Sequence, residues 1–392
     1  MESPTVFVAF GVTGDLMRLK ILPALYALYK KGDLPERFVL LGISRRDWSN
    51  ADLRSHIARA VSEGDQDSPE LTNFLQLLFF VNGDAQEKGL YDKLSESFDA
   101  LEAAWGGPAD KVLYLSLSPT LYKVAFEHLR HAPFAQDTKR VRLMIEKPVG
   151  TSGKSADRLH TILQNTFEER AIYRVDHYLA KEAMQNVPPI DGTLVSEIKI
   201  TFFETAGPDT RGAFYDATGA LRDVGQNHML EMLARTTMDY SRSEALEALP
   251  VLSSGEVEFS TTRGQYAGYL NIPGIAPGSV TETYFKISTY IDTLRFPKVR
   301  VVLEGGKRMA ENKKEIQVTF KDGRILTHSI GENKDRSEYE ILIHDCLRGN
   351  QTLFVSKREI IALWRFIDPI LDGWKTHQTQ PKVYEPGTNV LF

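Results

Sequence analysis

Buried strands alternate with helical segments through the first half of the chain, and this alternation constrains the fold more than any other feature. Residues 5–10 are a continuous apolar run that ends at Gly11. Residues 15–31 follow with apolar side chains at helical spacing, and residues 38–43 form a second buried run. The same features recur in two strand-like runs at 111–117 and 141–145 and two helical segments at 119–129 and 155–167. This order predicts a Rossmann-like, doubly wound parallel sheet with helices on its faces.

The pattern changes in the second half of the chain. Residues 194–203 form a long strand of alternating character. Four further strands separated by Gly turns are predicted at 281–290, 299–303, 315–320 and 324–328, and helices are predicted at 219–236, 338–347 and 358–374. This indicates an α+β region in which helices pack on an antiparallel sheet. We expect residues 1–175 to bind the nucleotide and residues 176–392 to bind substrate and support oligomerisation; residues 248–277 stay unassigned.

Composition argues against several classes of function. The net charge is -5, without a long run of like charge, so nucleic acid is a poor partner. No apolar run reaches the roughly 18 residues of a membrane helix, and no basic flank precedes the strand that starts at Thr5, as a signal peptide would require. The single cysteine, Cys346, cannot form an internal disulfide and fits a reducing compartment. We expect a cytoplasmic protein without nucleic-acid or membrane partners.

The first strand ends in a glycine-rich turn that opens a helix. Its sequence contains Gly11, Thr13, Gly14, Asp15 and Leu16. Glycines let the backbone approach a pyrophosphate, which the start of a helix favours electrostatically. The spacing is not the full Gly-x-Gly-x-x-Gly pattern, so a tight turn with Asp15 as helix cap is the alternative.

The second strand ends with Arg45, Arg46 and Asp47. An NAD site usually has an acid at this place for the ribose 2′-hydroxyl, whereas an arginine suits the 2′-phosphate of NADP. The pattern therefore favours NADP. Two solvated arginines are the alternative, and the nearby Asp47 leaves some use of NAD open.

Lys147 follows the strand at 141–145, at the sheet edge where doubly wound folds bind ligands. A lysine there could hold a substrate hydroxyl against the nicotinamide. The alternative is a surface pair between Glu146 and Lys147 before a turn-forming proline.

Two segments each hold a histidine within five residues of an aspartate: Asp176 with His177, and Asp223 with His228. A histidine that removes a proton needs a carboxylate to orient its ring and support its cation. The residues Tyr178 and Lys181 add donors and charge that could hold a phosphate beside His177. Each histidine could instead be a core or capping residue. Zinc is disfavoured, because the spacings HxxxH, HxH and CxxC are missing.

On these motifs the chain resembles the glucose-6-phosphate dehydrogenase family, nearly from end to end. The most specific matches are the Asp-His-Tyr-Leu-x-Lys-Glu segment at 176–182 and the Gln-Asn-His segment at 226–228. Further matches are the turn at 11–16, the segments at 142–152 and 214–223, Gly-Lys-Arg at 306–308 and Tyr-Glu-Pro-Gly-Thr at 384–388. Glu-Lys-Pro is less specific, since it also marks the glucose-fructose oxidoreductase and inositol dehydrogenase group.

The resemblance implies an NADP-dependent oxidation of glucose 6-phosphate at C1, the entry to the pentose phosphate pathway. It implies that His228 is the general base and that Asp176 orients its ring. Cofactor contacts are implied for Gly11, Thr13, Gly14, Asp15, Leu16, Arg45, Asp84, Ala85 and Lys147. Substrate contacts are implied for Lys147, His177, Tyr178, Lys181, Glu204, Asp223 and Lys307, with His177, Tyr178 and Lys181 on the 6-phosphate. No metal is implied.

Several departures from the family concern the outer part of the substrate site and the sheet. Asn312 stands where the family has a second lysine, and Glu304 reverses the charge of a family arginine. The family sequence before that arginine is also replaced, at 298–301. The helix that follows Asn186 in the family is cut to 187–192, and the segment between Phe320 and Glu338 is much shorter.

These departures motivate two alternatives to a compact glucose-6-phosphate dehydrogenase. One is a dehydrogenase of the same fold that acts on another sugar or sugar phosphate. The other is a homologue that binds cofactor or partner with little catalysis, which the presence of both His228 and Asp176 disfavours. In the family the large sheet forms the dimer contact, so we expect a homodimer that is weak, with one NADP per chain.

Overall fold

The computed structural model describes residues 3–61, 68–238, 241–377 and 380–389. It contains two compact units that are not consecutive in sequence. Unit 1 comprises Met1–Gly150, Asp157–Ala180 and Lys334–Val355, and unit 2 comprises Thr151–Ala156, Lys181–Asn333 and Ser356–Phe392. The expected division after residue 175 was a single cut, whereas the chain leaves unit 1 and later returns to it.

Within the described residues, unit 1 is built on a six-stranded parallel sheet with strand order β3-β2-β1-β4-β5-β6. Its strands are β1 (Thr5–Phe10), β2 (Phe38–Ser44), β3 (Leu78–Asn82), β4 (Asp110–Leu115), β5 (Val141–Glu146) and β6 (Ile172–Val175). Central β1 pairs with β2 and β4, so that Val6 lies opposite Val39 and Lys111. This is the strand order of a dinucleotide-binding Rossmann sheet, which changes direction between β1 and β4.

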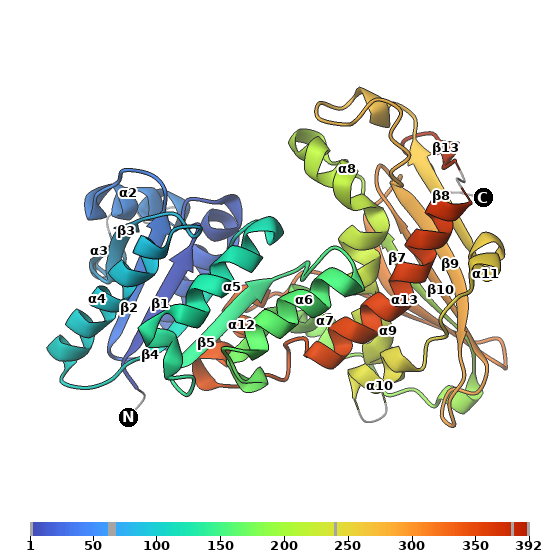
Figure 1. Cartoon of the computed structure of the whole chain (residues 1–392). Coiled ribbons are helices and arrows are strands. Elements are labelled where there is room, and N and C mark those ends of the chain that lie inside the picture. Colours follow the sequence, from blue (N-terminus) through green and yellow to red (C-terminus); the bar gives the residue numbers. More distant parts are fainter. Residues whose placement is uncertain (1–2, 62–67, 239–240, 378–379, 390–392) are drawn as a thin grey trace. The chain divides into compact units, whose positions relative to one another are not determined.

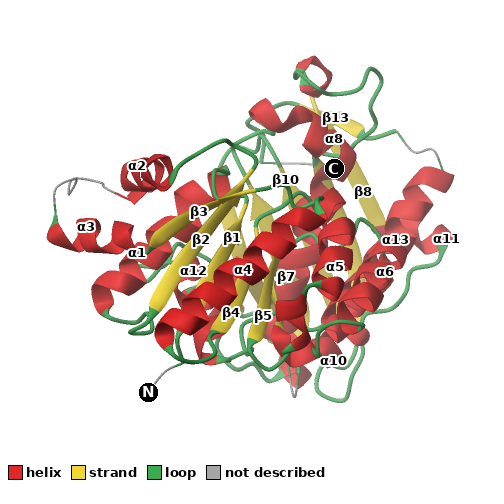
Figure 2. Cartoon of the chain, turned by 60° about the vertical axis from the view of Figure 1, so that its left-hand side comes forward, coloured by secondary structure: helices red, strands yellow, loops and turns green. Residues whose placement is uncertain are grey.

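Helices cover both faces of this sheet (Figures 1 and 2). The helices of unit 1 are η1 (Met17–Ile21), α1 (Leu22–Lys31), α2 (Asn50–Val61), α3 (Pro69–Gln76), α4 (Lys88–Trp105), η2 (Pro119–Leu121), α5 (Tyr122–His131), η3 (Pro133–Gln136), most of α6 (Gly153–Gln164), η4 (Glu169–Ala171), η5 (His177–Ala180) and α12 (Glu338–Arg348). Val6, Val8 and Phe10 pack against α4, α5 and α6. Phe7 and Ala9 face a second core that contains α1, α2, α3 and α12. Burial on both faces explains why β1 is apolar from Val6 to Phe10.

Unit 2 is built on a sheet with strand order β12-β11-β7-β10-β9-β8-β13 among the described residues. Its strands are β7 (Val195–Phe203), β8 (Thr261–Tyr266), β9 (Tyr284–Ile291), β10 (Val299–Gly306), β11 (Lys313–Phe320), β12 (Ile325–Ser329) and β13 (Lys382–Tyr384). The pairs β7–β10 and β8–β13 are parallel, and the other pairs are antiparallel.

The described residues of unit 2 also form helices, some of which pack on its sheet. They are α7 (Glu182–Gln185), η6 (Gly192–Leu194), η7 (Asp209–Arg211), α8 (Gly212–Ala220), η8 (Leu221–Met229), α9 (Leu230–Thr237), α10 (Arg242–Glu247), α11 (Ser254–Ser260), η9 (Tyr269–Asn271) and α13 (Lys357–Thr376). Segments η8 and α9 contact β7, and α13 packs against η8, α10 and α11. A capping box formed by Ser356 and Glu359 begins α13, since each side chain bonds the other residue's backbone N–H.

The predicted fold class is confirmed, with two corrections in unit 2. The sheet is mixed rather than antiparallel, because a long connection separates β7 from β10 and allows them to pair in parallel. The predicted helix at 219–236 is interrupted: Gly219 has φ +75° and ends α8, and η8 is a π-helix before α9. The unassigned residues 248–277 contain α11, β8 and η9. Among the described residues, no helix is both long and apolar enough to cross a membrane.

Candidate functional site

A cavity of about 520 Å³ opens in unit 1 where the carboxyl ends of β1, β2, β3 and β4 meet. Six residues predicted to contact the cofactor line it: Gly11, Thr13, Gly14, Arg45, Asp84 and Ala85. Its volume is within the usual range for cofactor and ligand pockets. Its place, at the point where the strand order reverses, is where doubly wound sheets bind dinucleotides. The residues present therefore fit a nicotinamide dinucleotide.

The turn after β1 requires glycine at its first position. Gly11 has φ +72°, and a Cβ there would lie 2.5 Å from the backbone oxygen of Ser116. The N–H of Gly14 donates to the oxygen of Gly11 at 2.9 Å, which closes the turn. A side chain at position 11 would both strain the backbone and push β4 away.

Charged side chains surround the cavity where β2 and β3 end. The guanidinium of Arg45 is 79% exposed and lies 3.9 Å from the carboxylate of Asp84. Arg46 also lines the cavity and lies over the ring of Trp48, 5.0 Å from its centroid. Arg45 is thus largely open to solvent where it lines the cavity, whereas Arg46 has an aromatic partner.

Three predicted cofactor residues are outside the set that lines this cavity: Lys147, which follows β5, and Asp15 and Leu16 of the turn after β1. Asp15 is 87% exposed and pairs with Arg18 at 3.2 Å. Leu16 packs against the core that contains α1. The contribution of Asp15 and Leu16 to a bound cofactor would come from the backbone of the turn.

A buried ion pair joins the ends of β5 and β6. Lys147 and Asp176 directly follow these strands, whose last residues, Glu146 and Val175, are register partners. The ammonium of Lys147 lies 2.7 Å from Oδ2 of Asp176, with side chains 6% and 0% exposed. Oδ1 of Asp176 accepts from the N–H of Tyr178 at 3.0 Å. Both carboxylate oxygens therefore have donors, and Lys147 is held at the edge of the sheet.

The predicted phosphate residues of unit 1 lie in the short helix η5. The ring of His177 stacks on Tyr339 at 5.9 Å and 16°, and lies 4.9 Å from the ring of Tyr178. Tyr178 is almost fully buried. Tyr339 belongs to α12, far along the chain, and was not among the predicted site residues.

Glu146 connects the same region to β4. Its carboxylate accepts hydrogen bonds from the hydroxyls of Tyr114 and Tyr339. Loss of water is the main cause that raises the pKa of Glu146 to about 7, and the nearby Asp176 adds to it. Lys147 and the two tyrosines act in the opposite direction. This carboxyl therefore changes charge near neutral pH beside the Lys147–Asp176 pair.

In unit 2, His228 lies on the π-helix η8. Its backbone N–H donates to Oδ1 of Asn227 at 2.6 Å, and Nδ2 of Asn227 donates to the oxygens of Arg222 and Asp223. The His228 ring stacks on Phe202 of β7 at 6.2 Å and 16°. A π-helix bonds residues five apart, so Asp223 and His228 lie one turn apart rather than at α-helical spacing. Such turns are frequent at functional sites.

Lys307 forms ion pairs with two other predicted substrate residues of unit 2, Glu204 and Asp223. Its ammonium lies 2.5 Å from Glu204 and 2.9 Å from Asp223. Burial would lower the pKa of Lys307, but the two carboxylates outweigh burial and raise it above its ordinary value. Glu204 follows β7 and Lys307 follows β10, so the parallel pairing of these strands brings them to one end of the sheet.

Lys181 is also in unit 2 and is 2% exposed. Its ammonium donates to the oxygen of Gly331 at 3.3 Å and to Glu332 at 3.0 Å. A buried ammonium with an exposed carboxylate partner can exchange that partner for a ligand anion.

Two departures from the family sequence, Asn312 and Glu304, have different positions relative to the predicted substrate residues of unit 2. Asn312 bonds the turn after β7, since its Oδ1 accepts from the N–H of Thr205 at 2.9 Å. Glu304 accepts from Lys199 at 2.6 Å and from the hydroxyl of Tyr284 at 2.7 Å. Because Glu304 pairs with Thr201 and its neighbour Gly305 with Phe202, Glu304 lies on the opposite sheet face from Phe202. The charge reversal is thus away from His228.

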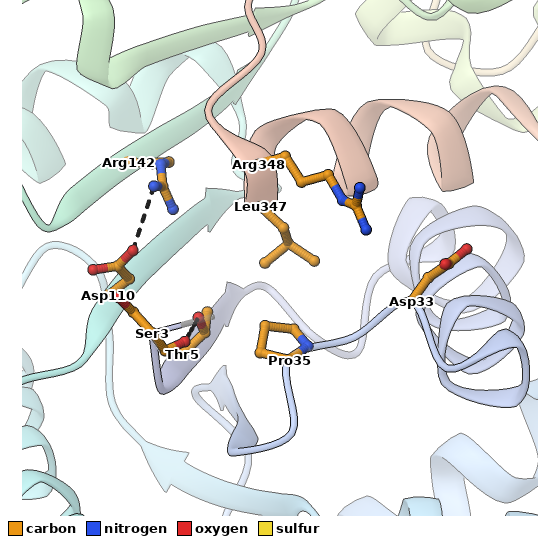
Figure 3. Close-up of a pocket in the computed structure, with 8 residues that line it drawn as sticks. All are labelled: Ser3, Thr5, Asp33, Pro35, Asp110, Arg142, Leu347 and Arg348. Carbon is orange, nitrogen blue, oxygen red and sulfur yellow. Dashed lines mark hydrogen bonds and ion pairs between the residues drawn. The ribbon is translucent and has the colours of Figure 1, made fainter. Parts of the chain in front are cut away.

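A further cavity in unit 1, of about 330 Å³, lies at the amino ends of β1 and β4 (Figure 3). Arg142 and Arg348 line it, and Arg142 lies 3.3 Å from Asp110. None of the predicted site residues is among those lining it. It lies at the edge of the sheet opposite the cofactor cavity.

Comparison with known proteins gives one family for the whole chain. The model described as glucose-6-phosphate dehydrogenase, NAD binding domain, matches residues 8–186. The model described as glucose-6-phosphate dehydrogenase, C-terminal domain, matches residues 187–334 and 323–390. The second model matches in two pieces that overlap in the region where a shortened sheet is predicted.

Similar curated proteins carry the same name. Glucose-6-phosphate 1-dehydrogenase of Bacillus subtilis is 30% identical over 466 positions, which cover 99% of this chain and 95% of the relative. Glucose-6-phosphate 1-dehydrogenase 2 of Mycobacterium bovis is 32% identical over 471 positions, which cover 99% and 91%. The alignment with the Bacillus subtilis protein has 466 positions, and this chain has 392 residues. At least 74 positions are therefore gaps in this chain, which is shorter than that relative.

A solved structure gives the same fold. It is a glucose-6-phosphate dehydrogenase in complex with its substrate glucose 6-phosphate, and it matches with a TM-score of 0.89 at 24% identity, covering 100% of this chain and 96% of that chain. The predicted family, oxidoreductase class and nicotinamide-binding domain are thereby confirmed. The chain belongs to the glucose-6-phosphate dehydrogenase family of oxidoreductases.

Proposed function

We propose that the chain oxidises glucose 6-phosphate at C1 to 6-phosphogluconolactone with NADP as cofactor. The observation that carries this proposal is the cluster in unit 2, where His228 lies beside Phe202 and Lys307 holds Glu204 and Asp223. A histidine next to acidic and basic side chains is suited to binding sugar hydroxyls and removing a proton from one of them. The solved relative with bound glucose 6-phosphate supports this choice of substrate.

His228 accepts the proton of the sugar 1-hydroxyl as hydride leaves C1, a transfer for which histidine is the side chain most often used. When bound, NADP supplies the hydride acceptor. Lys147, whose ammonium pairs with the Asp176 carboxylate, binds the reacting hydroxyl. The role of Asp176 in orienting the base stays a prediction, and Asp176→Asn tests it: kcat should fall with little change in NADP affinity.

We assign the other substrate contacts according to the charge and hydrogen-bonding groups of each side chain. His177, Tyr178 and Lys181 hold the 6-phosphate, while Glu204, Asp223 and Lys307 bind sugar hydroxyls. Arg45 binds the 2′-phosphate of NADP, because an exposed guanidinium that lines the cavity can form a bidentate pair with it.

The assay follows the absorbance of reduced cofactor with a panel of sugars and sugar phosphates, with NADP and then with NAD. Turnover highest with glucose 6-phosphate and NADP supports the proposal. Turnover with a different sugar phosphate would favour the second candidate, a related dehydrogenase, which Asn312 at the position of a family lysine motivates. His228→Ala serves as the control for contaminating enzyme.

A further inference from the structure

Lys314 lies at the same end of the unit 2 sheet as the predicted substrate residues. It is the second residue of β11 and the register partner of Phe202 on β7. Register partners place their side chains on the same face of a sheet. The Lys314 ammonium lies 4.9 Å from the centroid of the Phe202 ring, and His228 stacks on that same ring. Lys314 and the proposed base therefore contact the same aromatic ring.

Lys314 is also next to the segment that holds Lys181. Its backbone oxygen accepts from the N–H of Ile330 at 2.7 Å. One residue further on, the oxygen of Gly331 accepts from the ammonium of Lys181, which also pairs with Glu332. The segment 330–332 thus contacts both lysines, Lys314 through its backbone and Lys181 through its ammonium.

Among the site side chains described above at this end of the sheet, the carboxylates outnumber the ammonium groups when Lys314 is left out. Lys181 pairs with Glu332, and Lys307 pairs with both Glu204 and Asp223. These five side chains carry a net charge of about -1, which opposes the approach of an anion. Lys314 brings the group of six to neutrality.

Desolvation lowers the pKa of the Lys314 ammonium below its ordinary value. Glu204 and Glu332 act against this shift, and Lys181 and Lys307 add to it. Holding an ammonium in partial burial near two others has a free-energy cost, and such arrangements are concentrated at functional sites. A bound anion would offset that cost.

We propose that Lys314 is a substrate-binding residue that contacts the phosphate group of the sugar phosphate together with Lys181. The inference rests on the proposed function for the identity of the substrate, but the anion site itself does not depend on turnover. This proposal gives β11 a role in substrate specificity that the sequence motifs did not indicate. The family resemblance placed a lysine at position 312, but the residue there is Asn312, which bonds the Thr205 backbone.

The neighbouring residue provides a matched control. Lys313 is the register partner of Phe203, so its side chain is on the opposite sheet face, where it pairs with Glu315 at 3.0 Å. Lys313→Ala and Lys314→Ala remove the same charge from adjacent positions of one strand. Lys314→Arg keeps the charge.

Steady-state kinetics of the full chain test the role in the reaction. Lys314→Ala should raise the KM for glucose 6-phosphate about 10- to 150-fold, the range of a lost hydrogen bond to a charged group, and change the KM for NADP less than about 2-fold. The Ki of inorganic phosphate as a competitive inhibitor should rise in parallel. Lys313→Ala should match the wild type, and Lys314→Arg should recover most of the affinity.

A KM for Lys314→Ala equal to that of Lys313→Ala would overturn the proposal. So would a raised KM with an unchanged Ki for inorganic phosphate, which would place Lys314 on the sugar rather than on the phosphate. Calorimetric titration with inorganic phosphate gives a readout without turnover, and thermal melting checks that each variant folds. If the wild type binds phosphate through Lys314 but does not oxidise glucose 6-phosphate, the proposed function fails and the anion site stands.

Discussion

The two units build their sites by different means. In unit 1 the sheet is parallel and covered on both faces, and the cofactor cavity is formed largely by backbone turns such as the one at Gly11. In unit 2 one sheet face carries helices and the other carries polar pairs such as Glu197–Arg300 and Lys199–Glu304. Its site consists of side chains that hold one another by charge. The difference teaches that the shape of the cofactor cavity depends on chain geometry, whereas the cluster in unit 2 depends on the identity of its side chains.

The sharpest test of this division is His228→Ala. Removal of the proposed base should lower kcat by about 10²–10⁴-fold, because general base catalysis typically contributes that much. The affinity for NADP, measured by fluorescence or calorimetric titration, should stay the same, since the cavity is in unit 1. A loss of less than about tenfold would contradict the role of His228, and a parallel loss of NADP affinity would contradict the division.

Arg45→Ala tests the cofactor site of unit 1. It should weaken NADP binding about 10- to 150-fold and leave NAD binding nearly unchanged, because the 2′-phosphate is present in NADP alone. The ratio of dissociation constants for the two cofactors measures this effect. Equal losses for both cofactors would place Arg45 away from the phosphate. Arg46→Ala is the control, because Arg46 lies over Trp48.

Glu146→Gln tests whether side-chain charge also matters in unit 1. The raised pKa of about 7 means that the folded wild type binds more protons than the unfolded chain between about pH 4.5 and 7. Its stability should therefore fall as pH rises through this window, and the contribution stays lost above it. The groups that face this carboxyl are Lys147, Asp176 and the hydroxyls of Tyr114 and Tyr339.

Glutamine does not ionise, so this component of the pH dependence should vanish in the variant. Thermal melting of both proteins from pH 5 to 8 gives the comparison: the wild type should lose a few degrees relative to Glu146→Gln. Melting curves that shift in parallel across the range would mean that Glu146 does not ionise in this window.

The smallest expected effect concerns self-association of unit 2. One face of its sheet carries ion pairs such as Glu197–Arg300 and Lys199–Glu304, and stable interfaces usually bury roughly 1,200 Å² or more. We expect a dimer that dissociates on dilution more readily than the Bacillus subtilis relative, with one NADP per chain. Sedimentation at decreasing concentration and calorimetric stoichiometry measure these two properties. An intact dimer at nanomolar concentration, or two NADP per chain, would contradict them.

The fold and most of the cofactor side could be predicted from local patterns. Gly11, Gly14 and Arg45 end or follow apolar runs, and such turns meet at one sheet edge whenever the strands are parallel. Asp84 and Ala85 line the same cavity but were identified through the family resemblance. The strand before them, β3, is at the sheet edge and is buried at one of its five positions, so its apolar pattern is weak.

The remaining site residues could not be predicted, because their positions depend on contacts between distant segments. Tyr339 reaches His177 because α12 returns to unit 1, and no local pattern indicates this return. Lys314 reaches Phe202 through the register of β7 and β11. The π-helix η8 was missed because its repeat differs from the 3.6-residue period that identifies α-helices.

The return of α12 to unit 1 has a consequence for synthesis on the ribosome. Leu342, Ile343 and Cys346 of this helix complete the core that also contains Phe7 and Leu25. The chain is made from its N-terminus, and multi-unit proteins commonly fold in that order. Here the nucleotide-binding unit cannot close its core until Arg348, the last residue of α12, has left the exit tunnel. By then the intervening segment, Lys181–Asn333, has already emerged, so the unit that begins first is completed late.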